Sequence, residues 1–487
     1  MNYLSLPFAA FVLLLLILYY LVPKKGRFVV LLCGSLLFYA CFDLRYLPFL
    51  LFTALTSFFA AKLLERGDRR RLILTLCIAL NAAVWFVVKE LPWALFTLGR
   101  ILQRLNSGIP APQLSLLVPV GISYFSLQAI GYVVDVYRGK AAAETSFGKY
   151  LLFLSWFPAI VQGPISRYDQ LMPQLLHERP CRFETLRDHL VLILFGLVKK
   201  MVIADRLGIF VNACFGGYQD LQGVILYGAA VAYSIQLYMD FSGCVDICRG
   251  VSGLFGVELI PNFQRPYLAR SVKEFWGRWH MSLSGWLKDY VYIPLGGNRK
   301  GTGRKYVNLL LTFLVSGLWH GAGFNFFVWG TLHAVYQIVG ACTEELRSRC
   351  KRALGIRPGS RIDGVWRALV TFHLVAFAWI IFRAGGLMSG VGYVVNMFSS
   401  LSLGTLLDGT LQAMGMPYRW IAFLILHVLA VLAAEIRFEK TEDALQWLVS
   451  RRLPLRWAIC LLLIFDVLLF GVYGSGYSVA GFMYGGF

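Results

Sequence analysis

The chain has 487 residues, of which 58% are hydrophobic and only 15% are charged. Soluble domains carry about 25% charged residues, so a chain this long and this apolar is not an ordinary soluble protein but a polytopic membrane protein. The formal net charge of +20 would by itself point to nucleic acid. The Lys and Arg residues, however, fall mainly in short loops between apolar runs, which is the positive-inside pattern, so we expect no nucleic-acid partner.

The first apolar run, residues 5–22, has no basic region before it, and Lys24, Lys25 and Arg27 follow it. A cleavable signal peptide has the reverse order, so we expect a retained first helix that begins outside the cell and ends in the cytoplasm. The ten cysteines show no metal-ligand spacing, and we expect no metal site.

Apolar runs that could span a membrane, or nearly so, recur along the whole chain. A spanning helix needs about 20 residues and several runs are shorter, so we expect an all-α protein with roughly 11 transmembrane helices plus re-entrant or interfacial helices. With no repeat of fixed period and no separate soluble part, residues 1–487 form one predicted membrane domain. The runs lie near 5–22, 28–43, 47–63, 72–98, 114–134, 148–163, 187–212, 222–240, 307–340, 364–383, 387–400, 417–434 and 455–475.

Residues 272–290 carry apolar side chains every three or four positions, which predicts one amphipathic helix. Its tryptophans lie on the apolar side, and such a helix lies at or just below the membrane surface. At 100° per residue, His280 falls at the edge of the apolar stripe and is expected to point into a cavity. The glycines and asparagine at 296–298 then predict a turn.

The run 307–340 lies between two basic loops, 299–305 and 347–361, which both read as cytoplasmic. It must therefore leave the cytoplasm and return within about 34 residues, and each arm reaches only about 25 Å, short of a full crossing. The expected turn is near Gly317, Gly321 and Gly323, where glycine permits a break. His320 should then lie deep in the membrane at the tip of a broken hairpin, where irregular backbone must be buried by protein or line a wet cavity.

An ionisable side chain at that depth is a functional hypothesis by default. Imidazole is a general base near neutral pH, so His320 is a candidate base that takes the proton of a hydroxyl as its oxygen attacks an acyl carbonyl. His280 is a candidate to orient the acceptor or to donate to the oxyanion. A lone buried histidine more often only hydrogen-bonds a neighbour, and we assign that structural role to His333, His373 and His427.

Other polar residues near apolar runs leave two interpretations open. Asp240 either binds a polar substrate group or caps a helix or pairs with a basic residue. Arg167 either meets a phosphate or carboxylate or is an interfacial arginine. Lys199 and Lys200 are interpreted as the cytoplasmic boundary of the run 187–212. No P-loop, dinucleotide-binding glycine pattern, GxSxG elbow or HExxH zinc motif is present.

The segment FWGRWHMSLSGWLKDYVYIPLGGNRKG at 275–301, followed by GLWHG at 317–321, resembles the membrane-bound O-acyltransferase family. More narrowly, it is similar to the bacterial branch that acts in alginate, peptidoglycan and cellulose O-acetylation and in teichoic-acid D-alanylation. Residues 28–385 carry the resemblance and form the predicted catalytic core, while 386–487 match only in hydropathy and are expected to be C-terminal transmembrane helices. Further matching segments lie at 117–139, 157–168, 236–247 and 262–276.

The resemblance implies helices ringing a thin, funnel-shaped centre in the bacterial inner membrane. It implies His320 as the near-invariant family histidine and His280 as the second one. It also implies acetyl-CoA as a cytoplasmic donor substrate, with no bound cofactor. An extracytoplasmic partner of the serine-histidine-aspartate esterase-like (SGNH) type would place the acyl group on a polysaccharide. The expected substrate-binding residues are Trp279, Asp240, Asn325, Trp319 and Arg167.

Three functions remain open on the sequence. The first is acetyl transfer across the membrane for O-acetylation of an exopolysaccharide or the cell wall, and GGNRKG at 296–301 favours the alginate-like group. The second is acyl transfer to a lipid, a teichoic acid or a protein, for which the same two histidines would serve. The third is transport of an acylated carrier without chemistry. Transporters often show paired halves, and no internal duplication is visible here.

Overall fold

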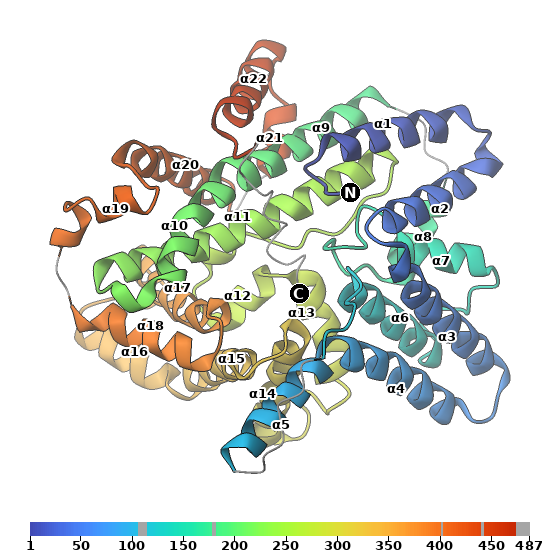
Figure 1. The fold of residues 1–487 in the computed structure, drawn as a ribbon, viewed down its shortest axis with the longest axis horizontal. Helices are drawn as coiled ribbons and strands as arrows, with labels where there is room; N and C mark the ends of the chain where they lie inside the picture. Colours follow the sequence, from blue (N-terminus) through green and yellow to red (C-terminus); the bar gives the residue numbers. More distant parts are fainter. Residues whose placement is uncertain (106–113, 178–181, 401–402, 440–442, 474–487) are drawn as a thin grey trace. The chain divides into compact units, whose positions relative to one another are not determined.

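The computed structural model describes residues 1–105, 114–177, 182–400, 403–439 and 443–473 (Figure 1). Ordered structure within these ranges is helical, and their one β-bridge joins Phe263 and Trp279. Six of the described helices are long and apolar enough to cross a membrane by length and composition. The protein is therefore an all-α polytopic membrane protein, as predicted, while the number of roughly 11 spans stays a prediction. The six segments are Leu44–Arg66, Arg70–Lys89, Val224–Leu254, Arg361–Arg383, Tyr418–Arg437 and Leu453–Phe470.

The chain divides into two compact units, and the predicted single domain with its core at 28–385 stays a prediction. The first unit comprises Met1–Ile193 and Cys244–Pro261, together with a terminal piece outside the described residues. Its helices are α1 (Leu6–Leu21), α2 (Lys24–Ala40), α3 (Leu47–Arg66), α4 (Arg70–Lys89), α5 (Leu91–Arg104), α6 (Ile122–Tyr137), α7 (Phe147–Ser155), α8 (Tyr168–Leu176) and most of α9 (Phe183–Leu197).

Helix α6 is the centre of the first unit, because nearly all of its side chains are buried. It packs against α3 and α4. Buried tyrosines add hydrogen bonds within the same unit: Tyr150 donates to the Ser57 hydroxyl at 2.7 Å and Tyr39 to the Val120 carbonyl at 2.9 Å. In an apolar surrounding each such bond spares the protein an unpaired polar group.

The second unit comprises Leu194–Gly243 and Asn262–Ala480, and it holds both candidate catalytic histidines. It begins with the π-helical turn η2 (Val198–Ala204) and α10 (Asp205–Gly216), and it contains the first two thirds of α11 (Val224–Leu254). The later helices are α12 (Val272–Arg278), α13 (Met281–Leu287), α14 (Gly301–His320), α15 (Phe324–Cys342), α16 (Glu344–Ala353), α17 (Arg361–Arg383), α18 (Leu387–Ser399), α19 (Thr410–Ala413), α20 (Tyr418–Arg437), α21 (Ala444–Val449) and α22 (Leu453–Phe470). The last predicted run, 455–475, ends two residues outside the described part.

The prediction of one amphipathic helix over 272–290 is wrong. The chain forms α12 and α13 with a break at His280, whose φ of 45° and ψ of 53° are left-handed. The break is held by the extended segment that starts at Asn262. The Met281 amide donates to the Asn262 carbonyl and the Ser282 amide to the Asn262 side-chain oxygen, both at 2.9 Å. These long-range bonds replace helical ones, which outweighs the local helical pattern and turns His280 away from the helix surface.

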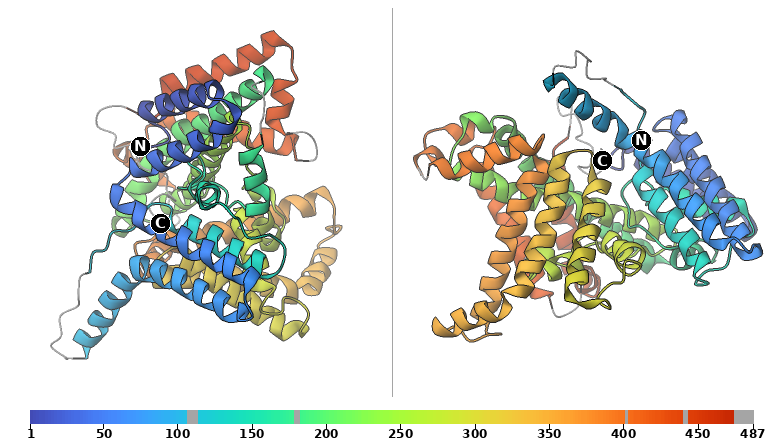
Figure 2. Two further views of the ribbon diagram at one scale, coloured as in Figure 1. Left: turned by 90° about the vertical axis from the view of Figure 1, so that its right-hand side faces the viewer. Right: turned by 90° about the horizontal axis from the view of Figure 1, so that it is seen from below.

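The predicted broken hairpin is present. Helices α14 and α15 pack side by side, yellow to gold in Figures 1 and 2, and the chain turns through residues 321–323. His320 is the last residue of α14, next to the turn, as expected. Gly317 was expected near the break but lies inside α14. A Cβ there would meet the Phe326 carbonyl oxygen at 2.5 Å, so this glycine serves the close approach of the two helices instead. The depth of the turn in the membrane stays a prediction.

Candidate active site

The fold brings the rings of His280 and His320 against one indole, that of Trp319. The ring centroid of Trp319 lies 5.9 Å from that of His280 and 4.9 Å from that of His320. Trp329 from α15 covers His320 edge to face at 5.0 Å, and His333 follows at 5.1 Å from Trp329. All three imidazoles are buried. These three histidines, with Trp276, Trp319 and Trp329, form what we call the histidine cluster.

His280 lies at the break between α12 and α13 and packs against α11. Its ring meets Phe241 edge to face at a centroid distance of 4.8 Å. The residue lies outside the six spanning helices. Burial lowers the pKa of His280 to about 3, so its imidazole is neutral at physiological pH. A neutral imidazole offers one N–H donor and one acceptor nitrogen, which suits the predicted role of orienting an acceptor or donating to an oxyanion.

His333 carries the structural hydrogen bond expected of it. The indole N–H of Trp276 donates to His333 Nδ1 at 3.2 Å, which places the ring proton of a neutral His333 on Nε2. His373 and His427 likewise have structural partners. His373 lies 2.7 Å from the Tyr227 hydroxyl, and His427 Nε2 lies 3.2 Å from the Asp466 carboxylate.

Three of the predicted substrate-binding residues also lie at or beside the cluster. Trp319 contacts both histidines, and Trp279 stacks on Phe275 at 5.3 Å. The Asn325 amide donates to the Ile381 carbonyl of α17 at 3.5 Å and to the carbonyl of Ala384, just after the end of the helix, at 3.4 Å. These contacts hold the turn of the hairpin against α17. That any of the three touches substrate stays a prediction.

Asp240 and Lys200 form a buried ion pair. Lys200 Nζ lies 2.5 Å from Asp240 Oδ1 and 2.7 Å from Asp205 Oδ1. The side chains of Lys200 and Asp240 are only 1% and 2% exposed, and the interpretation of Lys199 and Lys200 as a cytoplasmic boundary stays a prediction. A buried charge is tolerated when opposite charges surround it, and the turn of η2 supplies that arrangement. Of the two interpretations of Asp240, pairing with a basic residue is the one observed.

Arg167 lies outside this unit. It is the half-buried N-cap residue of α8, in the first compact unit. The interpretation of Arg167 as a phosphate or carboxylate ligand stays a prediction.

A cavity of about 1520 Å³ adjoins the histidine cluster within the second unit. We call it the basic cavity, because eight basic residues and one acidic residue line it. Its buried lining includes Trp276, Phe313 and Ser316, and its basic lining is more exposed. Ser316 lies one helical turn before His320 on α14, so the cavity extends to the neighbourhood of the candidate base. The basic residues are Arg270, Lys273, Lys288, Arg299, Lys305, Arg347, Lys351 and Arg367.

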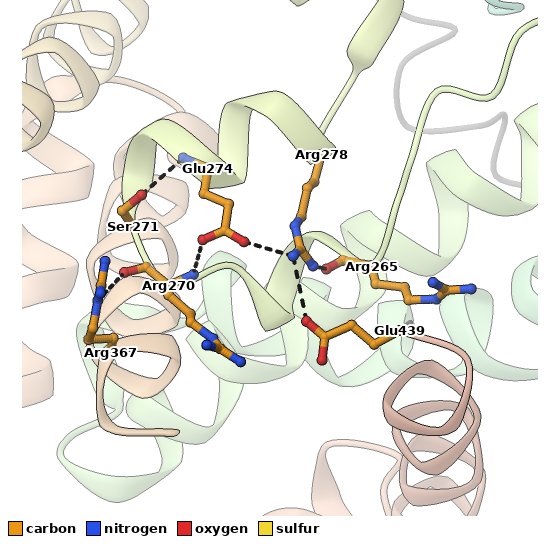
Figure 3. A network of polar contacts seen from close by, with 7 residues as sticks. All are labelled: Arg265, Arg270, Ser271, Glu274, Arg278, Arg367 and Glu439. Carbon is orange, nitrogen blue, oxygen red and sulfur yellow. Dashed lines mark hydrogen bonds and ion pairs between the residues drawn. The ribbon is translucent and has the colours of Figure 1, made fainter. Parts of the chain in front are cut away.

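A polar network fixes α12, the helix that supplies Trp276 and leads into His280 (Figure 3). The Ser271 hydroxyl caps the helix by accepting from the Glu274 amide at 3.1 Å. The Arg278 guanidinium lies 2.7 Å from Glu274 and 3.5 Å from Glu439, and Arg367 donates to the Arg270 carbonyl at 3.1 Å. Sequence reasoning missed this network because its partners come from three distant parts of the chain.

Within the described residues no group of three or more His, Cys, Asp or Glu side chains could hold a metal ion. The site offers two buried imidazoles that contact one tryptophan near a cavity, and imidazole chemistry is of the acid–base type. Ionisable side chains buried in this way in a membrane protein are a functional hypothesis, and the catalytic use of the two histidines stays a prediction.

Comparison with known proteins identifies the family. The model of MBOAT, the membrane-bound O-acyltransferase family, matches residues 80–382, which include the histidine cluster and all residues that line the basic cavity. The chain belongs to this family and is an O-acyltransferase.

Three relatives show the range of acceptors within the family. The chain is 35% identical over 390 residues to the probable alginate O-acetylase AlgI of Pseudomonas aeruginosa, covering 78% of this chain and 72% of the relative. It is 32% identical over 397 residues to a peptidoglycan O-acetyltransferase of Helicobacter pylori, covering 75% and 72%. It is 27% identical over 286 residues to a teichoic acid D-alanyltransferase of Bacillus subtilis, covering 56% and 70%.

Proposed function

We propose that this O-acyltransferase takes an acetyl group from cytoplasmic acetyl-CoA and passes it across the bacterial inner membrane for O-acetylation of a polysaccharide. An SGNH-type extracytoplasmic partner would complete the transfer to the polymer. The higher identity to proteins named for alginate and peptidoglycan O-acetylation than to one named for D-alanylation supports an acetyl group and a polysaccharide acceptor.

The observation that carries the proposal is the basic cavity. Pockets for drug-sized ligands are about 300–1,000 Å³, and this cavity is larger, at about 1520 Å³, as a long donor requires. Its excess of basic side chains complements the phosphates of coenzyme A. Several of them belong to the basic segments 299–305 and 347–361, which the positive-inside pattern assigns to the cytoplasm. Donor entry from the cytoplasm follows from that assignment.

The chemistry follows from the buried end of the cavity. An acyl-CoA whose phosphates contact the basic residues extends its thioester end past Trp276 toward Ser316 and His320. His320 takes the proton of an acceptor hydroxyl, the hydroxyl oxygen bonds to the acyl carbon, and the carbon–sulfur bond breaks. The thiolate then takes up the proton. His280, a neutral imidazole that contacts Trp319 as His320 does, orients the acceptor hydroxyl or donates to the oxyanion.

Inside-out membrane vesicles carrying the protein test the proposal. Acetyl-labelled acetyl-CoA is supplied outside, and release of free CoA and appearance of label on luminal acceptors are followed with the partner present and absent. We expect His320→Ala to abolish both signals, while His373→Ala, a change at an exposed histidine, retains them. Luminal label that persists in His320→Ala would instead mean transport of an acylated carrier. Preference for a long-chain acyl-CoA would indicate a lipid or protein acylation function.

A further inference from the structure

We propose that the hydroxyl of Ser316 holds the carbonyl oxygen of the donor thioester and stabilises the negative charge that forms on it. The inference rests on the proposed function, because it assigns a role to a residue at the buried end of the basic cavity. Ser316 would then be a catalytic residue in addition to the two histidines.

The first observation is the state of the hydroxyl. Ser316 is only 1% exposed and lines the basic cavity, and its Oγ has no hydrogen-bond partner. A buried polar atom without a partner costs about 1–3 kcal/mol, so native proteins rarely keep one without a reason. A ligand in the cavity that accepts a hydrogen bond from Ser316 would remove this cost.

The second observation is that several other hydroxyls on helices of the second unit do find a partner, although the buried Ser242 hydroxyl of α11 has none. A serine or threonine inside a helix normally donates to the carbonyl four residues earlier. Ser234 does so to Ala230 at 3.0 Å, Thr312 to Asn308 at 2.7 Å and Thr331 to Phe327 at 2.8 Å. Ser316 occupies a helix in the same way, yet its hydroxyl makes no such bond. It stays available to a group in the cavity.

The third observation is position. Ser316 and His320 are four residues apart on α14, so they share one face of the helix with Cβ atoms about 5–6 Å apart. The neighbouring glycine, Gly317, packs directly on the Phe326 carbonyl of α15, which fixes this turn of α14. Trp276 and Phe313 form apolar walls beside Ser316. A carbonyl held by Ser316 is thereby placed within reach of a hydroxyl that His320 deprotonates.

The step balances as follows. The acceptor oxygen forms a bond to the acyl carbon as its proton moves to His320, and the carbonyl electron pair moves onto the oxygen that Ser316 contacts. The pair then returns to form the new ester carbonyl. The carbon–sulfur bond breaks, and the CoA thiolate takes the proton from His320. Ser316 keeps its own proton throughout, because it acts as a hydrogen-bond donor and never as the nucleophile.

The test compares Ser316→Ala with Ser316→Thr and with a matched control. Removing one oxyanion donor lowers kcat by about 100- to 1,000-fold in well-studied cases, and we expect at least about tenfold here from a single neutral hydroxyl. Ser316→Thr, which keeps the hydroxyl, should retain most of the rate. Ser234→Ala makes the same change at a buried serine whose hydroxyl already has a backbone partner, and it should keep the wild-type rate.

Binding and stability separate this role from a structural one. Free CoA has no acyl carbonyl, so its affinity should be the same in Ser316→Ala and the wild type. Because the lost hydroxyl had no partner, the thermal midpoint of the purified variant should not fall. A wild-type rate in Ser316→Ala, or equal losses of rate, CoA affinity and thermal midpoint that Ser316→Thr does not restore, would overturn the inference.

His320→Ala is assayed beside these variants. If it is inactive while Ser316→Ala is fully active, only the role of Ser316 is wrong. If His320→Ala itself retains CoA release, the proposed function fails, whatever Ser316 does.

Discussion

The second unit buries ionisable side chains in an ion-paired triad and in the histidine cluster, among other positions, and it treats these two sets in opposite ways. In the triad, Lys200 lies 2.5 Å from Asp240 and 2.7 Å from Asp205, so one cation faces two carboxylates. The histidine cluster has aromatic rings around its imidazoles, with Trp319 and Trp329 at 4.9 and 5.0 Å from the ring of His320. The charged side chains of the triad contact one another, whereas the histidine cluster lies beside a cavity large enough for a substrate.

This difference distinguishes buried ionisable groups that stabilise a membrane protein from those that are candidates for catalysis. Burial of an ionisable group is common to both places, so burial alone does not mark a catalytic residue. An internal partner set that saturates the group indicates a structural role. Aromatic walls around an imidazole next to a cavity support the proposed reactive role of His320. Removing a residue should therefore affect stability at the triad and activity at the cluster.

The largest effect is expected at His320. General base catalysis contributes about 100- to 10,000-fold, so His320→Gln, which keeps similar bulk without a base, should lower the rate of CoA release by about that factor. The variant should accumulate in membranes and unfold at nearly the wild-type temperature. Initial rates and thermal unfolding of the purified protein check both points. A fall in stability with activity retained per folded molecule would make His320 part of the scaffold instead.

Lys200→Met should give the opposite pattern. Breaking a buried pair by removing one partner costs about 3–5 kcal/mol, because the two carboxylates are left without their counter-charge. Thermal unfolding in detergent, with expression in membranes as a second readout, measures the loss. Adding Asp240→Asn to Lys200→Met should recover part of it. If Lys200→Met were stable but inactive, the triad would belong to the catalytic machinery.

Trp276→Phe tests two roles of one residue of the histidine cluster, as hydrogen-bond donor to His333 and as a wall of the basic cavity. The substitution leaves His333 Nδ1 without its donor, which costs about 1–3 kcal/mol for a buried acceptor. It also opens the wall of the basic cavity, so longer acyl-CoA donors should be accepted better relative to acetyl-CoA. Thermal unfolding and competition between acyl-CoA donors measure the two effects. Trp457→Phe, at an exposed tryptophan of α22, is the control, and equal behaviour of the two variants would contradict the prediction.

The smallest effect is a pH dependence of stability. The pKa of His280 falls from 6.5 to about 3 on folding. Below pH 6.5 the unfolded chain therefore binds a proton that the folded chain does not bind until about pH 3, so the free energy of unfolding decreases as pH falls through this window. His280→Gln should flatten the decline. The measurement is the thermal midpoint of each variant between pH 3 and pH 6.5. Parallel curves of midpoint against pH for His280→Gln and wild type would refute the lowered pKa of His280.

Much of the site was predictable from the sequence, for local reasons. The apolar runs predicted a membrane protein, and the basic loops around 307–340 predicted a hairpin whose turn follows His320. The motifs around His280 and His320 predicted the family. These features depend on composition, on the spacing of charges and on the glycines near the turn. All three are local properties of the sequence.

The sequence by itself therefore determined the membrane class, the family, and the two histidines. Only the tertiary structure decided how they are used. The break at His280 depends on hydrogen bonds that Asn262 accepts from the residues after it. The ion pair of Asp240 depends on Lys200, forty positions earlier. The exposure of the Ser316 hydroxyl to a ligand depends on a cavity whose walls come from several helices. Each of these outcomes depends on contacts between residues distant in the chain, which no local pattern records, and such contacts override local propensity when they bury and satisfy polar groups.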